Sequence, residues 1–165
     1  MCSGGARTAR LRAELSSRGT SMAGVTNKPG DRPVDSMVAL VSAIDKGRAV
    51  PGRRDWVEYL DLGVEEASCG KLSTHLLRLR SGMTEPTGWH VHPCEFQWVY
   101  MLDGWMDVQF EDGTSPRVEA GSVLFIPGGW GHNEIRTSDA ASGIEVFMPP
   151  HPGTLPIDTP ATWQT

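Results

Sequence analysis

The sequence is poor in cysteine, in long apolar runs and in clustered basic residues. Its 165 residues include three cysteines, Cys2, Cys69 and Cys94. This odd set lacks the spacing of a disulfide framework and indicates a reducing, cytoplasmic setting. No run of about 18 apolar residues is present, so we expect no membrane-spanning helix. The net charge of −5 and the lack of a basic stripe argue against a nucleic-acid partner, which leaves a small molecule as the expected one.

The first 35 residues differ in composition from the rest of the chain. Four arginines stand among Ala, Ser and Gly, and a cluster of Pro and Gly follows. A transit peptide has this composition, but the apolar residues are too few for an amphipathic face. We favour a disordered arm, or an over-long start with Met22 as the initiator. The length fits one domain, so we expect an arm over residues 1–35, a folded domain over 36–150 and an extended, proline-rich tail over 151–165.

Short segments that favour β-structure recur at a spacing of about ten residues. They are separated by turn-forming Gly, Asp and Pro. The segments are 56–60, 73–80, 96–102, 105–110, 122–126 and 144–148. This pattern predicts an all-β fold, an antiparallel barrel or jelly roll, rather than alternating strands and helices. One short helix is predicted within residues 36–50, with Asp35 or Ser36 as N-cap and Gly47 just past its end.

Strand alternation predicts which side chains face the barrel interior. If Gln97 points inward, Val99 and Met101 do so as well, and Trp98 and Tyr100 face outward. Large outward aromatic side chains need cover from the N-terminal segment or from a second subunit, so we expect a homodimer.

Two further expectations concern the turn after this strand and the last long strand. Asp103-Gly104 favours a hairpin that folds back the strand carrying Gln97. In the segment 144–148, burying Glu145 without a partner would cost several kcal/mol. We therefore expect Ile144, Val146 and Met148 to face inward, unless Glu145 contacts the site.

Histidines in two separated segments carry the strongest functional signal. On a strand, His90 and His92 lie on one face with Cα atoms roughly 7 Å apart. Two imidazoles at that separation can bind one divalent ion at about 2.0–2.1 Å if other strands supply further ligands. His132 follows a glycine-rich loop, 128–131, whose flexibility allows its ring to turn back toward the pair. His90, His92, Gln97 and His132 are the predicted ligands, whereas His75 and His151 are expected to be structural or on the surface.

The spacing of these residues closely resembles the two signature motifs of the cupin superfamily. His90-x-His92, four residues, Gln97, six residues and Gly104 resemble the first motif. Gly121, five residues, Pro127-x-Gly129, two residues and His132 resemble the second. The resemblance covers roughly residues 50–150, is nearest to small single-domain cupins, and implies a double-stranded β-helix with the metal inside one mouth. It also favours a homodimer.

Three positions depart from the family pattern. Gln97 stands where most metal-binding cupins have glutamate, Thr84 where the first motif opens with glycine, and Arg136 where the second often closes with asparagine. Only Gln97 affects the chemistry directly. With neutral ligands the ion keeps its double charge, which predicts weaker metal binding and a preference for carboxylate, enolate or diol groups. The alternative is a three-histidine site in which Gln97 only donates hydrogen bonds.

The identity of the ion stays open, because this donor set suits Fe, Zn, Ni, Mn or Cu. Cys94 is interpreted as a thiol in the pocket wall. Glu95 is a candidate general base at the mouth, with a solvated side chain as the alternative.

Three functions remain compatible with these residues. The first is a metal-dependent dioxygenase, in which an enolate or diol binds beside O2. The second is a non-redox lyase, isomerase or cyclase, in which the ion acts only as a Lewis acid. The third is a binding or sensing module without turnover. We predict a metal-dependent enzyme acting on a small oxygenated molecule.

Overall fold

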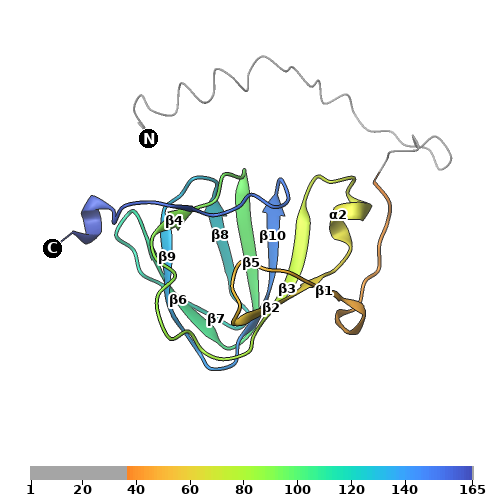
Figure 1. Ribbon diagram of the computed structural model, residues 1–165, viewed down its shortest axis with the longest axis horizontal. Helices are drawn as coiled ribbons and strands as arrows, with labels where there is room; N and C mark the ends of the chain where they lie inside the picture. Colours follow the sequence, from red (N-terminus) through yellow and green to blue (C-terminus); the bar gives the residue numbers. More distant parts are fainter. Residues whose placement is uncertain (1–36, 165) are drawn as a thin grey trace, which may run out of the picture. The chain divides into compact units, whose positions relative to one another are not determined.

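Two antiparallel sheets face each other in the computed structural model, which describes residues 37–164 (Figure 1). The larger sheet contains, in spatial order, β1 (Arg48–Val50), β2 (Val57–Asp61), β3 (Ser73–Leu79), β10 (Ser142–Met148), β5 (Phe96–Asp103) and β8 (Val123–Pro127). The smaller sheet contains β11 (Leu155–Pro156), β4 (His90–Val91), β9 (His132–Thr137), β6 (Trp105–Phe110) and β7 (Arg117–Glu119). This is the double-stranded β-helix that the sequence predicts. The arm over 1–35 and the alternative start at Met22 lie outside the described residues.

Helical structure is confined to three short elements among the described residues. These are η1 (Ile44–Lys46), α2 (Val64–Ala67) and η2 (Ala161–Trp163). Where the sequence predicted a helix over 36–50, the described part forms only the single 3-10 turn η1, followed by strand β1. The apolar side chains of Val38 and Val41 are exposed, so an amphipathic helix would have no surface to bury here. Pairing of β1 with β2 supplies backbone hydrogen bonds instead.

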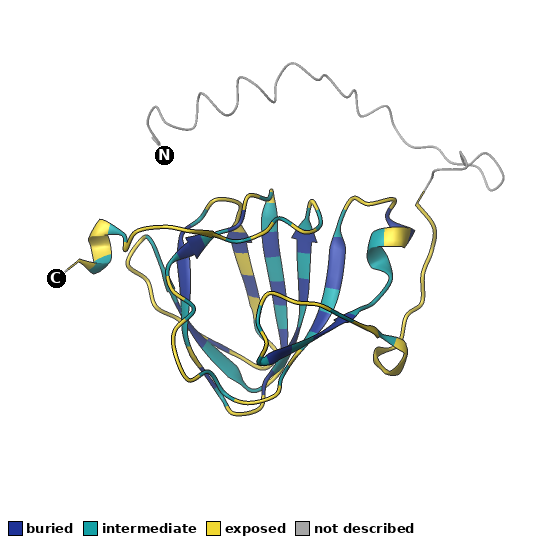
Figure 2. Cartoon of the chain, in the orientation of Figure 1, coloured by how far each residue is buried: buried dark blue, intermediate teal, exposed yellow. Residues whose placement is uncertain are grey.

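The interior is packed by side chains that alternate along the strands (Figure 2). On β5, Gln97, Val99 and Met101 are buried while Trp98 and Tyr100 are half-buried, as predicted. The apolar core between the sheets is formed by Val99, Met101, Val108, Val118, Leu124, Ile126 and Ala141. Val99 and Met101 on β5 belong to this core. Because Gln97 lies on the same face of β5, their packing fixes its position within the barrel.

The Asp103-Gly104 turn connects the two sheets and does not form the predicted hairpin. β5 pairs with β10 and β8, whereas β6 pairs with β7 and β9. Gly104 has a positive φ of 71°, and a Cβ atom there would lie 2.4 Å from the Ala140 carbonyl oxygen. The sequence therefore located the turn correctly, but close packing against the chain around Ala140 directs it into the opposite sheet.

Strand β10 faces the interior with the side chains that were expected only if Glu145 contacts the site. Glu145 and Phe147 are buried, each 1% exposed, and Ile144, Val146 and Met148 are only half-buried. The prediction rested on the cost of burying an unpaired carboxylate, but Glu145 is paired. Its Oε1 lies 2.7 Å from an Arg53 guanidinium nitrogen. The partner comes from the loop before β2, far away in the sequence.

The C-terminal segment packs on the smaller sheet. β11 pairs with β4, and the indole nitrogen of Trp163 donates a hydrogen bond of 2.7 Å to the carbonyl oxygen of Phe110. The tail therefore contributes a strand, β11, to the smaller sheet. Across residues 37–164, no helix has the length and apolar character needed to cross a membrane.

Candidate metal centre

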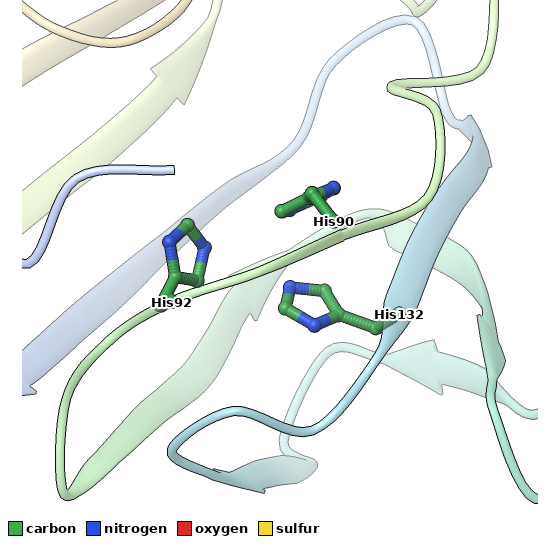
Figure 3. Close-up of side chains that lie close together, drawn as sticks. All are labelled: His90, His92 and His132. Atoms are coloured by element: carbon green, nitrogen blue, oxygen red, sulfur yellow. The ribbon is translucent and has the colours of Figure 1, made fainter. Parts of the chain in front are cut away.

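Three histidines from β4, its C-terminal edge and β9 meet inside the barrel (Figure 3). His90 lies directly opposite His132 in the β4–β9 pairing, and their ring centroids are 4.3 Å apart. His92 lies 5.1 Å from His90 and 5.3 Å from His132 by the same measure. One ring nitrogen from each residue lies within 4.8 Å of the others. The three predicted imidazoles therefore converge on one point.

Hydrogen bonds to main-chain carbonyl oxygens orient all three rings. Nδ1 of His90 lies 2.8 Å from Gly88 O, Nδ1 of His92 lies 2.5 Å from Gly153 O, and Nδ1 of His132 lies 2.9 Å from Trp130 O. A carbonyl only accepts, so each Nδ1 carries the proton and each Nε2 keeps its lone pair for a metal. Nε2 of His132 is buried and has no hydrogen-bond partner among the described residues.

Burial keeps the imidazoles of His92 and His132 in the neutral form that binds metal ions. Burial, helped by nearby Arg53, His132 and His90 and opposed by the Gly153 carbonyl, lowers the pKa of His92 to about 4. Burial also lowers the pKa of His132, although Glu134 opposes this. These two rings are thus uncharged near neutral pH, which fits a divalent cation.

A glycine-rich loop brings His132 to this position. Gly128 passes so close to the chain at Cys94 that a Cβ atom there would lie 1.5 Å from the Cys94 carbonyl oxygen. Gly129 has a φ of +74°, which favours glycine. These two positions explain why the loop before His132 is rich in glycine.

Gln97 lines the same cavity as His90 and His92. Its Nε2 donates a hydrogen bond of 2.9 Å to Glu145 Oε1, which fixes the orientation of the amide. Its Oε1 is buried without a hydrogen-bond partner among the described residues. The amide oxygen is thus available to a ligand.

Three charged side chains lie near the histidines: Glu134 and Arg53, which the sequence did not indicate, and Glu145, which it named only as a possible contact of the site. Glu134 lies two residues after His132 on β9, and its carboxylate oxygens are 3.7 Å from Nε2 of His90 and 3.8 Å from Nε2 of His132. Burial raises the pKa of Glu134, but the two rings and the Thr87 hydroxyl outweigh burial and hold it at about 2. No strand was predicted at His132. With a strand there, alternation would have placed Glu134 on the same face as His132.

A cavity of about 100 Å³ opens beside the histidines. Most of its walls are apolar. The polar and charged lining residues include Arg53, Thr87, His90, His92, Gln97, Glu134 and Glu145. A small molecule that enters this space meets His90, His92 and the Glu145 carboxylate.

Four other residues considered from sequence lie elsewhere. Glu95 is exposed and Cys94 half-buried, and neither is among the residues that line the cavity. His151 is exposed and forms an ion pair of 2.7 Å with Glu65, while His75 is half-buried. His75 and His151 therefore have the structural or surface positions expected. The carboxylates that line the cavity belong to Glu134 and Glu145, not to Glu95.

Comparison with known proteins agrees with this architecture. Residues 76–147 match the family described as Cupin domain. No curated protein is significantly similar to the chain. The structure is similar to the polyketide cyclase RemF from Streptomyces resistomycificus, with a TM-score of 0.58 and 18% identity over 76% of this chain and 89% of that one.

Two further solved structures share the fold. KdgF from Halomonas sp. has a TM-score of 0.55 and 16% identity over 68% of this chain and 94% of that one. An RmlC-like cupin from Shewanella frigidimarina has a TM-score of 0.54 and 18% identity over 69% of this chain and 94% of that one. The chain contains a cupin domain with a buried three-histidine cluster suited to a metal ion.

Proposed function

We propose that the protein is a metal-dependent enzyme that acts on a small oxygenated molecule, with the ion held by His90, His92 and His132. The observation that carries this proposal is the orientation of the three rings. Each ring is tied at Nδ1 to a carbonyl and directs Nε2 toward a shared centre. A cluster of buried imidazoles with an unpartnered nitrogen has no packing advantage over apolar side chains.

The donor set and the cavity indicate which molecules fit. A divalent ion bound here would act as a Lewis acid on a carbonyl or hydroxyl oxygen of the substrate. The apolar walls exclude water, and the cavity volume of about 100 Å³ restricts the part of the substrate inside it to a few non-hydrogen atoms. A carboxylate, enol or diol group would provide the oxygen atoms.

The arrangement favours a non-redox lyase, isomerase or cyclase over a dioxygenase. Glu145 lies in the cavity with Arg53 and Gln97 bound to Oε1, while Oε2 has no partner among the described residues. Oε2 can accept a proton or hold a substrate hydroxyl. The similarity to RemF, a polyketide cyclase by its name, supports this reaction class. A binding or sensing protein would use the same cavity without turnover.

Elemental analysis and a histidine variant test the proposal together. Protein purified without added metal is expected to contain about one equivalent of Zn or Mn and to consume no O2 with candidate enols or diols. His92→Ala should lose the metal, because it removes one of three ligands. Stoichiometric Fe, Ni or Cu with oxygen uptake would instead establish the dioxygenase. Equal metal content in His92→Ala and the parent would refute the site.

We further propose a cytoplasmic homodimer, in which a second copy covers the outer face of β5 and β8. Val123 and Phe125 on β8 are 55% and 58% exposed. Phe125 stacks on Phe96 at 5.7 Å, next to the half-buried Trp98 and Tyr100, so the apolar surface is continuous. Light scattering is expected to give twice the chain mass for the parent and the single mass for Phe125→Glu. A monomeric parent at micromolar concentration would contradict this.

A further inference from the structure

Glu134 occupies a position in the histidine cluster that the family pattern does not assign. It follows His132 by two residues on β9, so both side chains point to the same face of the strand. One carboxylate oxygen lies 3.7 Å from Nε2 of His90 and the other lies 3.8 Å from Nε2 of His132. These are the same two nitrogens that the Nδ1 hydrogen bonds leave available for a metal ion.

The two distances do not correspond to direct hydrogen bonds. An N–H···O hydrogen bond in a protein measures about 2.7–3.2 Å, which is shorter than either separation. Two ligand atoms bound to one ion at about 2.1 Å, at angles from square to tetrahedral, lie about 3.0–3.4 Å apart. The carboxylate thus stands slightly beyond ligand spacing, and a small shift of a side chain closes the gap around a cation.

Thr87 holds the carboxylate in place. Its hydroxyl donates to Glu134 Oε2 over 2.5 Å, and the Glu134 N–H donates back to the same hydroxyl oxygen over 3.1 Å. The main-chain N–H of Thr87 also donates to the Glu134 carbonyl over 2.9 Å. Carboxylates that bind metals are commonly fixed by such outer hydrogen bonds, which leave further lone pairs for the ion.

We propose that Glu134 is a ligand of the ion and supplies the negative charge that glutamine at position 97 cannot. This inference rests on the proposed metal site and adds one residue to it. With Glu134 bound, the ion and its protein ligands carry a net +1 instead of the +2 inferred from Gln97 alone. A neutral diol or enol, or a single carboxylate, then satisfies the charge of the centre.

Titration with Co²⁺ tests this inference without any substrate. The visible absorption of bound Co²⁺ reports its ligands and geometry, and competition with a chelator gives the Kd. Glu134→Gln keeps the shape of the side chain but removes its charge, so we expect Kd to rise about 100-fold and the absorption bands to shift. Thr87→Val should raise Kd by about tenfold, because it removes the two hydrogen bonds between the hydroxyl and Glu134 but leaves the carboxylate itself.

Matched controls separate this inference from the proposed function. Glu119 is exposed on β7, far from the histidines. Glu119→Gln changes the net charge by the same amount as Glu134→Gln and should leave the Kd and the spectrum of bound Co²⁺ unchanged. If Glu134→Gln binds Co²⁺ with the parent's Kd and spectrum while His92→Ala binds none, the metal site stands and Glu134 is not a ligand. If the parent itself binds no Co²⁺, both proposals fail.

Discussion

Two carboxylates paired with arginine, Glu145 and Asp107, differ in how completely their oxygens are satisfied. Asp107 on β6 lies opposite Arg117 on β7 and Arg136 on β9. Four guanidinium hydrogen bonds of 2.7–3.1 Å reach its two oxygens. Glu145 receives Arg53 and Gln97 on Oε1 alone, and Oε2 is buried without a partner among the described residues.

The surroundings of the two carboxylates explain the difference. Arg117 also stacks on Trp105, with its guanidinium carbon 3.8 Å from the ring centroid, so the Asp107 cluster is closed by its own side chains. Glu145 faces the cavity that the histidines line. A fully paired carboxylate stabilises the sheet, whereas an incompletely paired one is available to a bound molecule. The buried acid with a free oxygen is therefore the one that we propose to contact a bound molecule.

The same substitution in the two clusters gives the largest expected contrast. Arg53→Met leaves Glu145 with only the Gln97 hydrogen bond in a site where its side chain is 2% exposed. We expect a loss of about 2–3 kcal/mol in the free energy of unfolding, reduced because the Arg53 side chain is itself 32% exposed. Arg136→Met leaves both Arg117 bonds to Asp107 and should lose less than about 1 kcal/mol. Urea denaturation measures both, and equal losses would contradict the contrast.

Removing both charges of the inner pair sharpens this result. The double variant Arg53→Met, Glu145→Met no longer buries an unpaired carboxylate, so we expect it to be more stable than Arg53→Met alone by about 1–2 kcal/mol. The measurement is again the urea midpoint. If the double variant is less stable than the single one, the destabilisation by Arg53→Met comes from lost packing on Phe147, over which the guanidinium lies at 4.9 Å.

The outer cluster predicts the smallest effect, a dependence of stability on pH. Hydrogen bonds from Arg117, then those from Arg136, lower the pKa of Asp107 to about 2 from its usual 3.8 and outweigh the opposing effect of burial. The unfolded chain therefore takes up the proton first. The stabilisation is complete above pH 3.8 and is lost as the pH falls toward 2. The stability difference between the parent and Asp107→Asn should shrink over that interval.

A second titration does not disturb that comparison. The pKa of His92 falls from 6.5 to about 4 on folding, so the parent and the variant both lose stability between these two pH values. Subtracting one denaturation series from the other, in the presence of a chelator, removes this shared loss. A difference that stays constant from pH 5 to pH 2 would show that Asp107 is not stabilised by its arginines.

Local pattern was enough to predict the longer strands β2, β3, β5, β6, β8 and β10 and the histidine cluster. Alternation placed Gln97, Val99 and Met101 inward, and the family spacing grouped His132 with His90 and His92. These features depend on residues close in sequence or on one family motif. Most of the fold and the three imidazoles of the cluster could therefore be predicted from the sequence.

Pairings between distant segments explain what the sequence analysis missed. Glu145 was placed outward because Arg53, its partner 92 residues away, lies in a loop with no periodic signal. Asp103-Gly104 was recognised as a turn, but its exit direction depends on packing against Ala140. Strand β9 was not predicted. The position of Glu134 on the same face as His132 could therefore not be inferred from strand alternation.

The carbonyl of Gly153 that orients His92 lies outside the stretch that matches the family, and so does Arg53. Proteins that share this 76–147 core can therefore differ in the two flanking segments that hold His92 and Glu145. Alignments restricted to the shared core would group such proteins together, even where the residues around the histidine cluster differ. Truncating the chain after Pro150 to aid crystallisation would remove the carbonyl that orients the His92 ring and leave this ring free to turn.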